Sequence, residues 1–282
     1  MPSFAQISAP SRDVVWVTVG GAVLYRSTDR GETWEQRPLP PAGQFPAIAL
    51  VSDREGWVQE LGPFGLNCAT AVARFWHTTD AGASYEPIPP AGLPDRRCKS
   101  GFSFADASRG FVSDWAPGTA PRVHRTTDGG RTWTGSALPD PPGFTTGSGG
   151  PTLVAGEVRS FGTTLLADAT AQTGTGVNAY LFRSLDGGAT WTYLATVPSG
   201  AERGLGLATA TRWLSLEPPA PRETTDAGAS WHPYTSDYQQ AAPVPPTVVF
   251  ADASVGYATV RGSIQRTLDG GAHWSAIKTP GT

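Results

Sequence analysis

The sequence predicts an all-β protein, a six-bladed β-propeller whose blades are four-stranded antiparallel sheets. Two observations lead to this prediction. One eight-residue turn pattern recurs six times along the 282 residues, and a second turn pattern lies upstream of several copies. No segment shows the periodicity of an amphipathic helix. Short strands joined by turns, repeated every 40 to 50 residues or so, are typical of propellers.

The recurring octet begins with Ser or Thr, has Asp third and Gly fifth, and ends with Trp or Tyr. These residues suit a hairpin turn: the carboxylate accepts backbone N–H bonds, glycine supplies a positive φ, and the aromatic residue starts the next strand. We therefore expect the octet aspartates to be structural. They are Asp29, Asp80, Asp128, Asp186, Asp226 and Asp269.

The second pattern is a turn that follows one β-prone run and starts another with an aromatic residue. It is clearest at 53–57, 106–111 and 252–257. Each repeat therefore contains, in order, strand A, a turn, strand B, a loop, strand C, the octet and strand D. In the third repeat we expect strands at 102–105, 110–113, 122–126 and 132–135.

The octet resembles the Asp-box, also called the bacterial neuraminidase repeat. Its combination with the upstream turn resembles the photosystem II stability/assembly-factor class of Asp-box propellers. This resemblance covers the whole chain and implies an Asp-box in the turn between strands C and D of each blade. It also implies that the boxes lie on the face away from the usual binding site. Asp-boxes occur in sialidases, other glycosidases, receptors and assembly factors, so the resemblance implies no single activity.

The six repeats predict one propeller domain over residues 1–282. Repeats one and six each contain their own strands A to D, so we expect no strand exchanged between them. The ring is therefore expected to close by side-chain packing between the first and last blades.

Composition excludes several classes of protein. The net charge of −3 and the pI near 5.8 argue against a nucleic-acid partner. No apolar run is long enough to span a membrane, and 1–6 has no secretory leader pattern. The histidines show no metal-ligand spacing, and no glycine-rich segment fits a dinucleotide loop. We expect a monomer without a cofactor or a bound metal.

Long, non-repeating loops are expected on one face only, which carries the B–C loops and the connections between blades. The B–C loops of blades two to four are assigned to 59–71, 113–121 and 167–179. Long loops on a rigid scaffold are where binding usually occurs. Function is therefore expected on this face.

The two cysteines, Cys68 and Cys98, both fall on this face and between neighbouring blades. This placement allows a disulfide, and the alternative is a pair of free thiols. A disulfide would require an oxidising compartment. Proteins with this type of repeat are often exported, so we expect an extracytoplasmic protein.

A small basic cluster surrounds Cys98, and arginine suits recognition of carboxylates or phosphates. The candidate binding residues are Arg74, Asp95, Arg96, Arg97, Asp114, Trp115 and Arg122. Trp115 is included because it has no counterpart in the other repeats and is assigned to a loop. The alternative interpretation is a set of solvated loop charges and a tryptophan that packs within its own loop.

These observations favour a non-catalytic binding or scaffold propeller that recognises a protein or a glycan through the long-loop face. One alternative is a sialidase-like glycoside hydrolase, although the chain lacks the Arg-Ile-Pro motif of that class. Another is a small-molecule enzyme with a pocket at the mouth of the central channel. A convergent pair of acidic residues at that mouth would favour an enzyme over a binding surface.

Overall fold

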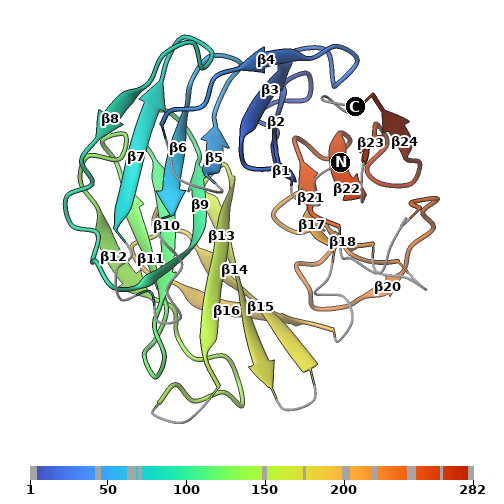
Figure 1. The fold of residues 1–282 in the computed structure, drawn as a ribbon. Coiled ribbons are helices and arrows are strands. Elements are labelled where there is room, and N and C mark those ends of the chain that lie inside the picture. The colour runs from blue at the N-terminus through green and yellow to red at the C-terminus, as the bar shows by residue number, and fades with distance from the viewer. Residues whose placement is uncertain are drawn as a thin grey trace.

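The structure is a ring of six blades around a central axis (Figure 1). This computed structural model describes residues 5–41, 46–61, 68, 72–147, 151–173, 176–198, 204–216, 221–239, 246–260 and 263–278. They form six four-stranded antiparallel sheets, so the predicted all-β six-bladed propeller is confirmed. The described residues include no helix that could cross a membrane.

The first three blades each use four consecutive strands, numbered from the centre outward. Blade one comprises β1 (Ala5–Ser8), β2 (Val15–Val19), β3 (Val23–Ser27) and β4 (Glu35–Arg37). Blade two comprises β5 (Ala47–Leu50), β6 (Gly56–Leu61), β7 (Ala73–Thr78) and β8 (Glu86–Ile88). Blade three comprises β9 (Cys98–Phe104), β10 (Gly110–Trp115), β11 (Arg122–Thr126) and β12 (Thr134–Ala137).

The last three blades repeat this order with more variable strand lengths. Blade four comprises β13 (Leu153–Phe161), β14 (Thr164–Thr173), β15 (Gly176–Ser184) and β16 (Thr192–Val197). Blade five comprises β17 (Leu205–Leu207), β18 (Trp213–Ser215), β19 (Arg222–Thr224) and β20 (His232–Pro233). Blade six comprises β21 (Val248–Phe250), β22 (Gly256–Val260), β23 (Ser263–Thr267) and β24 (Ser275–Ile277).

Strand order gives the ring two distinct faces. Within each blade, consecutive strands pair antiparallel in chain order. The A–B turns and the octets therefore share one face, which we name the octet face. The B–C loops and the connections between blades share the opposite face, which we name the long-loop face.

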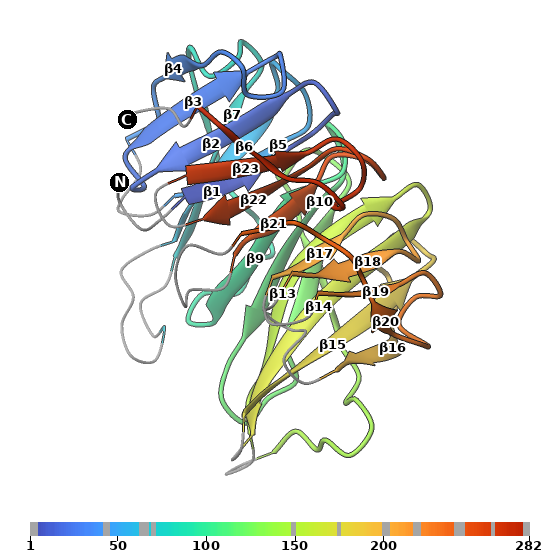
Figure 2. The same cartoon turned by 90° about the vertical axis from the view of Figure 1, so that its right-hand side faces the viewer.

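Blade four differs from the prediction. The segment 167–179 is expected as a loop, but its described residues lie in β14 and β15, whose ladder continues to the pair Thr173 and Gly176. Small side chains at Ala167, Ala169 and Ala171 are buried, so the long strands pack closely. Figure 2 shows this hairpin extending past the short strands of blade five.

Large aromatic side chains join neighbouring blades. Trp16, Trp57, Trp213 and Tyr257, each at or near the start of a strand B, have no exposed surface. The Trp16 indole donates a hydrogen bond to the Ser52 carbonyl of the next blade (3.1 Å). The Trp57 indole donates to the Gly129 carbonyl in the octet of blade three (3.0 Å). Burying each such side chain contributes roughly 2–3 kcal/mol. Each belongs to an apolar cluster that combines residues of two neighbouring blades, so the core lies between the blades.

Within the described residues the ring closes without strand exchange, as predicted, because the strands of blades one and six each pair within their own sheet. Ile7, Val17, Tyr257 and Ile277 belong to one apolar cluster shared by the two blades. Arg266 of blade six donates to the Arg30 carbonyl (2.8 Å) and pairs with Glu32 (2.7 Å). Side-chain packing and these polar contacts therefore hold the two blades together.

Candidate functional site

The predicted binding residues gather where blade three meets the long-loop face. The β9–β10 ladder places Trp115 opposite Cys98 and Asp114 opposite Lys99. The β10–β11 ladder places Asp114 opposite Arg122. Residues distant in the sequence therefore meet at one end of one sheet.

Asp114 is completely buried and lies between an arginine side chain and a histidine side chain. Its Oδ1 accepts a hydrogen bond from Arg97 Nε (2.6 Å), and its Oδ2 contacts His124 Nε2 (2.7 Å). Burial by itself would raise the pKa of this carboxyl group. The hydrogen bonds and charges of His124 and Arg97 outweigh that effect and hold the pKa of Asp114 below its ordinary value. We name Arg97, Asp114 and His124 the buried clamp.

The clamp also uses the remaining donors of Arg97. Its two terminal nitrogens donate to the Thr119 hydroxyl (3.0 Å) and the Ala120 carbonyl (3.1 Å). Arg97 and Asp114 are thus occupied with each other and with their own loop. In this geometry they position the surface rather than present free charge to a ligand.

The sequence context of Trp115 predicts that it lies in a loop, and this prediction is wrong. Trp115 is the last residue of β10, where pairing with Cys98 continues the sheet past the expected end at residue 113. A register shift between Ser113 and Asp114 lets the strand continue. The side chain of Trp115 is half-buried at the edge of the face.

The remaining predicted residues are exposed. Arg74, Asp95, Arg96 and Arg122 all present their side chains to solvent. Arg74 lies on β7 of blade two and pairs with Glu60 across the β6–β7 ladder (3.4 Å). Arg96 and Arg122 flank the buried clamp in blade three. We name Arg74, Arg96 and Arg122 the basic patch.

The predicted disulfide between Cys68 and Cys98 is present, with a Cα separation of 5.0 Å. It ties the B–C segment of blade two to the first residue of β9. Next to it, Arg96 has a positive φ of 63°. Lys99 donates through Nζ to the carbonyls of Pro94 (2.8 Å) and Arg97 (3.1 Å). Burial lowers the pKa of Lys99. The cystine and these contacts fix the backbone beneath the patch.

The sequence did not predict that His124 belongs to this site. The spacing of the histidines in the sequence argues against metal ligation and does not point to a pairing of His124 with Asp114. Among the described residues no group of His, Cys, Asp or Glu could hold a metal ion. The available signal was its position, since side chains two residues apart on a strand share a face. His124 therefore shares a face with Arg122, the residue opposite Asp114.

Each octet aspartate accepts hydrogen bonds from within its own turn. In each octet the first hydroxyl donates to the Asp Oδ1 at 2.7–2.9 Å and accepts from the glycine N–H at 2.7–3.0 Å. In the first five octets a later Ser or Thr hydroxyl donates to Oδ2 at 2.6 Å. The hydroxyl and backbone N–H of Ser84 hold the pKa of Asp80 at about 2.

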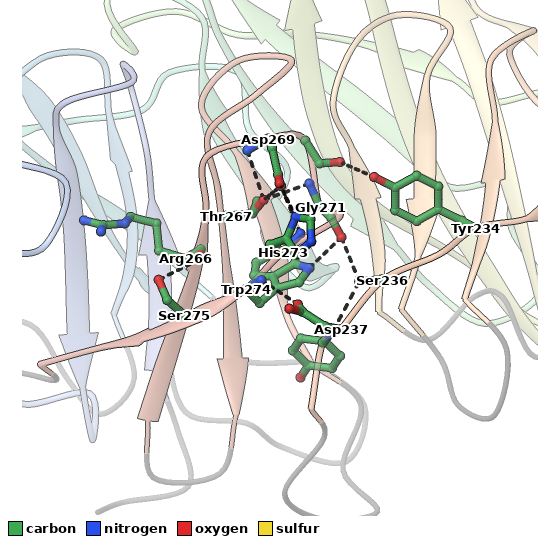
Figure 3. A network of polar contacts seen from close by, with 12 residues as sticks. Tyr234, Ser236, Asp237, Arg266, Thr267, Asp269, Gly271, His273, Trp274 and Ser275 are labelled. Atoms are coloured by element: carbon green, nitrogen blue, oxygen red, sulfur yellow. Dashed lines mark hydrogen bonds and ion pairs between the residues drawn. The ribbon is translucent and has the colours of Figure 1, made fainter.

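The sixth octet departs from this pattern, as Figure 3 shows. His273 replaces the hydroxyl residue, and its Nδ1 lies 2.6 Å from Asp269 Oδ2. The preceding connection packs against the same turn. Ser236 donates to the Gly271 carbonyl (2.7 Å), and Asp237 accepts from the Trp274 N–H (2.7 Å). The turn is therefore occupied by contacts within the protein.

A cavity of about 390 Å³ lies on the axis, lined by the ends of the innermost strands of all six blades. The sequence offers a pocket at the mouth of the central channel as an alternative, without assigning it to either face. The lining of the cavity runs into the A–B turns, for example Pro10, Arg109, Gly162 and Asp252, so it lies towards the octet face. The cavity is therefore separate from the basic patch.

One acidic pair lies beside this cavity. Glu157 lines it, whereas Asp168 packs behind it against the backbone of Gly156. Burial, followed by the negative charge of Glu157, raises the pKa of Asp168 to about 6. The acidic residue with the perturbed pKa is therefore not part of the described cavity lining.

Comparison with sequence relatives identifies the repeat. The BNR/Asp-box repeat model matches residues 25–36. Xyloglucanase Xgh74A from Acetivibrio thermocellus is 28% identical over 139 residues, which is 45% of this chain. The match spans only 16% of that enzyme.

Solved structures of other propellers share the fold across nearly the whole chain. The Hadza microbial sialidase Hz136 has a TM-score of 0.60 at 15% identity, covering 93% of this chain and 65% of that one. A protein of unknown function from Dyadobacter fermentans has a TM-score of 0.57 at 16% identity, covering 97% and 92%. YCF48 from Cyanidioschyzon merolae has a TM-score of 0.52 at 17% identity, covering 98% and 84%. These likenesses show the fold alone.

Proposed function

Since the chain is a six-bladed Asp-box propeller, we propose that it is a non-catalytic binding protein that uses its long-loop face. Its ligand is a protein or glycan that carries carboxylates, and the contact surface is the basic patch with Trp115. The observation that carries this proposal is which arginine side chains on this face are buried in ion pairs and which are exposed. The buried clamp neutralises Arg97 internally, whereas Arg96 and Arg122 stay exposed. Arg74 is also exposed, and it pairs with Glu60.

A rigid support favours such a surface. The cystine, the Lys99 contacts and the buried clamp fix the backbone around Arg96 before any ligand arrives. A preorganised surface loses less conformational entropy on binding. Exposed guanidinium groups on it can form paired hydrogen bonds with carboxylates, and the half-buried Trp115 adds an apolar contact.

The disulfide also supports a location. Cystines persist in oxidising compartments and are rare in the cytosol. We therefore assign the protein to the extracytoplasmic space, where it acts as a monomer and needs no cofactor.

The proposal is tested by screening arrays of acidic peptides and carboxylated glycans. The test variant is Arg96→Ala/Arg122→Ala. The matched control is Arg12→Ala/Arg54→Ala, which removes two exposed arginines from A–B turns on the octet face. We expect the wild type and the control to bind the same acidic ligands and the test variant to lose them. Equal binding by all three proteins would refute the patch as the contact surface.

A second candidate is a hydrolase, favoured by the raised pKa of Asp168 beside Glu157. Glycosidases need two carboxyl groups about 5 to 10 Å apart, one of them protonated. Access argues against this candidate, since Asp168 lies outside the described cavity lining. Turnover of a fluorogenic glycoside by the wild type, abolished in Asp168→Asn, would establish the hydrolase. Absence of turnover across a broad glycoside panel supports the binding protein.

A further inference from the structure

The axial cavity has a polar feature that the repeat does not explain. The ladder between β13 and β14 shifts register between Ala155 and Val158, so Gly156 and Glu157 form a β-bulge. A bulge inserts an extra residue and changes the direction of its side chain. This bulge brings Glu157 into the wall of the cavity.

The bulge is built around a second carboxylate. A Cβ placed on Gly156 would lie only 2.1 Å from Asp168 Oδ2, so only glycine fits there. The same close packing continues towards blade three, where a Cβ on Gly101 would lie 2.0 Å from the Gly156 carbonyl oxygen. Two glycines and a half-buried acid therefore hold Glu157 in place.

Glu157 presents its carboxylate together with a guanidinium group. Arg159 Nη2 lies 2.8 Å from Glu157 Oε2, and both residues line the cavity. One wall of the cavity thus offers hydrogen-bond acceptors and donors side by side. Such a pair suits vicinal hydroxyl groups, which donate to a carboxylate and accept from a guanidinium group.

The rest of the lining completes a neutral, amphipathic site. The charged lining residues balance, with Arg109 and Arg159 against Glu157 and Asp252. The buried Ser103 hydroxyl on this lining has no hydrogen-bond partner within the described part of the chain. Phe104 and Phe161 supply aromatic surface. Balanced charge disfavours an ionic ligand, and the volume falls within the range of small-molecule sites.

We propose that the axial cavity is a binding site for a neutral, hydroxylated small molecule of about monosaccharide size. The Glu157–Arg159 pair bonds its hydroxyl groups, while Phe104 and Phe161 contact its C–H faces. This site is separate from the long-loop face, and the inference holds whether or not the basic patch binds a ligand.

The test is ligand-observed NMR titration of the folded chain with methyl β-D-glucopyranoside and with myo-inositol. We expect saturable binding of at least one probe and affinity roughly tenfold lower in Glu157→Gln, because a charged hydrogen bond is lost. The matched control is Glu35→Gln on β4, which also removes a carboxylate paired with arginine but lies on the outermost strand of blade one. Glu35→Gln and Arg96→Ala/Arg122→Ala should bind the probes as the wild type does.

Two results would overturn the inference. One is the absence of saturable binding of both probes to the wild type up to their solubility limits. The other is equal affinity in Glu157→Gln and Glu35→Gln. Should Glu157→Gln fail to fold, amide shift mapping on the wild type decides the question. Shifts centred on Phe104 and Phe161 support the cavity, and shifts centred elsewhere exclude it.

Discussion

At the scale of single residues, one histidine distinguishes the last octet from the other five. His273 takes the place of a Ser or Thr hydroxyl and contacts the Asp269 carboxylate. The Asp269 hydrogen bond and charge, with a further contribution from Asp237, raise the pKa of His273 above its ordinary value. Among the six octets, this one alone has a histidine in place of the hydroxyl residue, so a side chain that changes its charge takes part in the turn.

His273→Thr should remove a pH-dependent part of the stability. Because the folded pKa is raised, the stabilisation from His273 is complete below the unfolded pKa of about 6.5. It disappears as the pH rises through the higher folded pKa. The Tm advantage of the wild type over His273→Thr is therefore expected to shrink between mildly acidic and alkaline pH. A Tm difference that does not change with pH would contradict this account.

Asp114→Asn should destabilise the protein without changing the shape of the side chain. The substitution leaves Arg97 without its counter-charge in a position where only 18% of its side chain is exposed. Removing one member of a buried ion pair costs about 3 kcal/mol or more. The free energy of unfolding in urea would measure the loss, with Asp95→Asn, an exposed acid, as the control. Equal stability of the two variants would show that the clamp has no structural role.

At the scale of elements, the octet turn depends on one position that only glycine fills. Its fifth residue has a positive φ in all six copies, between 75° and 101°. The fourth residue also has a positive φ, yet Arg30, Ala81 and Ala227 occupy it. The strict requirement is therefore confined to the fifth residue, where the glycine N–H bonds the first hydroxyl.

Gly188→Val should therefore be strongly destabilising. Gly188 has a φ of 86°, and an added Cβ would lie 3.1 Å from the ring of Phe111. A β-branched residue in this conformation costs about 2 kcal/mol, before any clash is counted. Gly187→Ala is the control, because alanine occurs at the equivalent fourth position in two other octets. Similar Tm values for both variants would contradict the turn assignment.

The octet turns could be predicted from the sequence, whereas the β14–β15 hairpin and the burial of Asp114 could not. The turns were predictable because Asp, Gly and hydroxyl residues act within eight residues. The β14–β15 hairpin was not, since β14 is rich in Ala and Thr and lacks a clear hydrophobic alternation. The burial of Asp114 depends on Arg97 and His124, which approach it only through the sheet and the loop between blades. The chemistry of the patch was therefore visible in the sequence, but its division into clamp and surface was not.

At the scale of the whole molecule, the ring is closed by side chains rather than by a shared strand. The Trp34 indole donates to the Lys278 carbonyl (2.7 Å), and Ile277 packs near Gly31 across the junction. The junction between blades one and six thus joins the two ends of the chain. The stability of a ring closed by side chains depends on apolar packing at that junction.

Ile277→Ala should weaken this junction in particular. Loss of a buried isoleucine side chain costs about 2 to 4 kcal/mol. Ile88→Ala is the matched control, since Ile88 is equally buried and also ends a fourth strand. Hydrogen exchange should accelerate in β1 and β24 for Ile277→Ala and not for Ile88→Ala. The same exchange pattern in both variants would mean that the junction is not a distinct cooperative unit.

The central claim is that the long-loop face of blades two and three is the contact surface for an acidic ligand. The most direct measurement compares the Kd values of Arg96→Ala/Arg122→Ala and Arg12→Ala/Arg54→Ala for the strongest acidic ligand from the arrays. Arg96→Ala/Arg122→Ala loses two charged hydrogen bonds, which should raise its Kd by roughly tenfold or more. The Kd of Arg12→Ala/Arg54→Ala should stay at the wild-type value. A ratio of Kd values near one would contradict the claim, because the two variants lose the same charge from opposite faces.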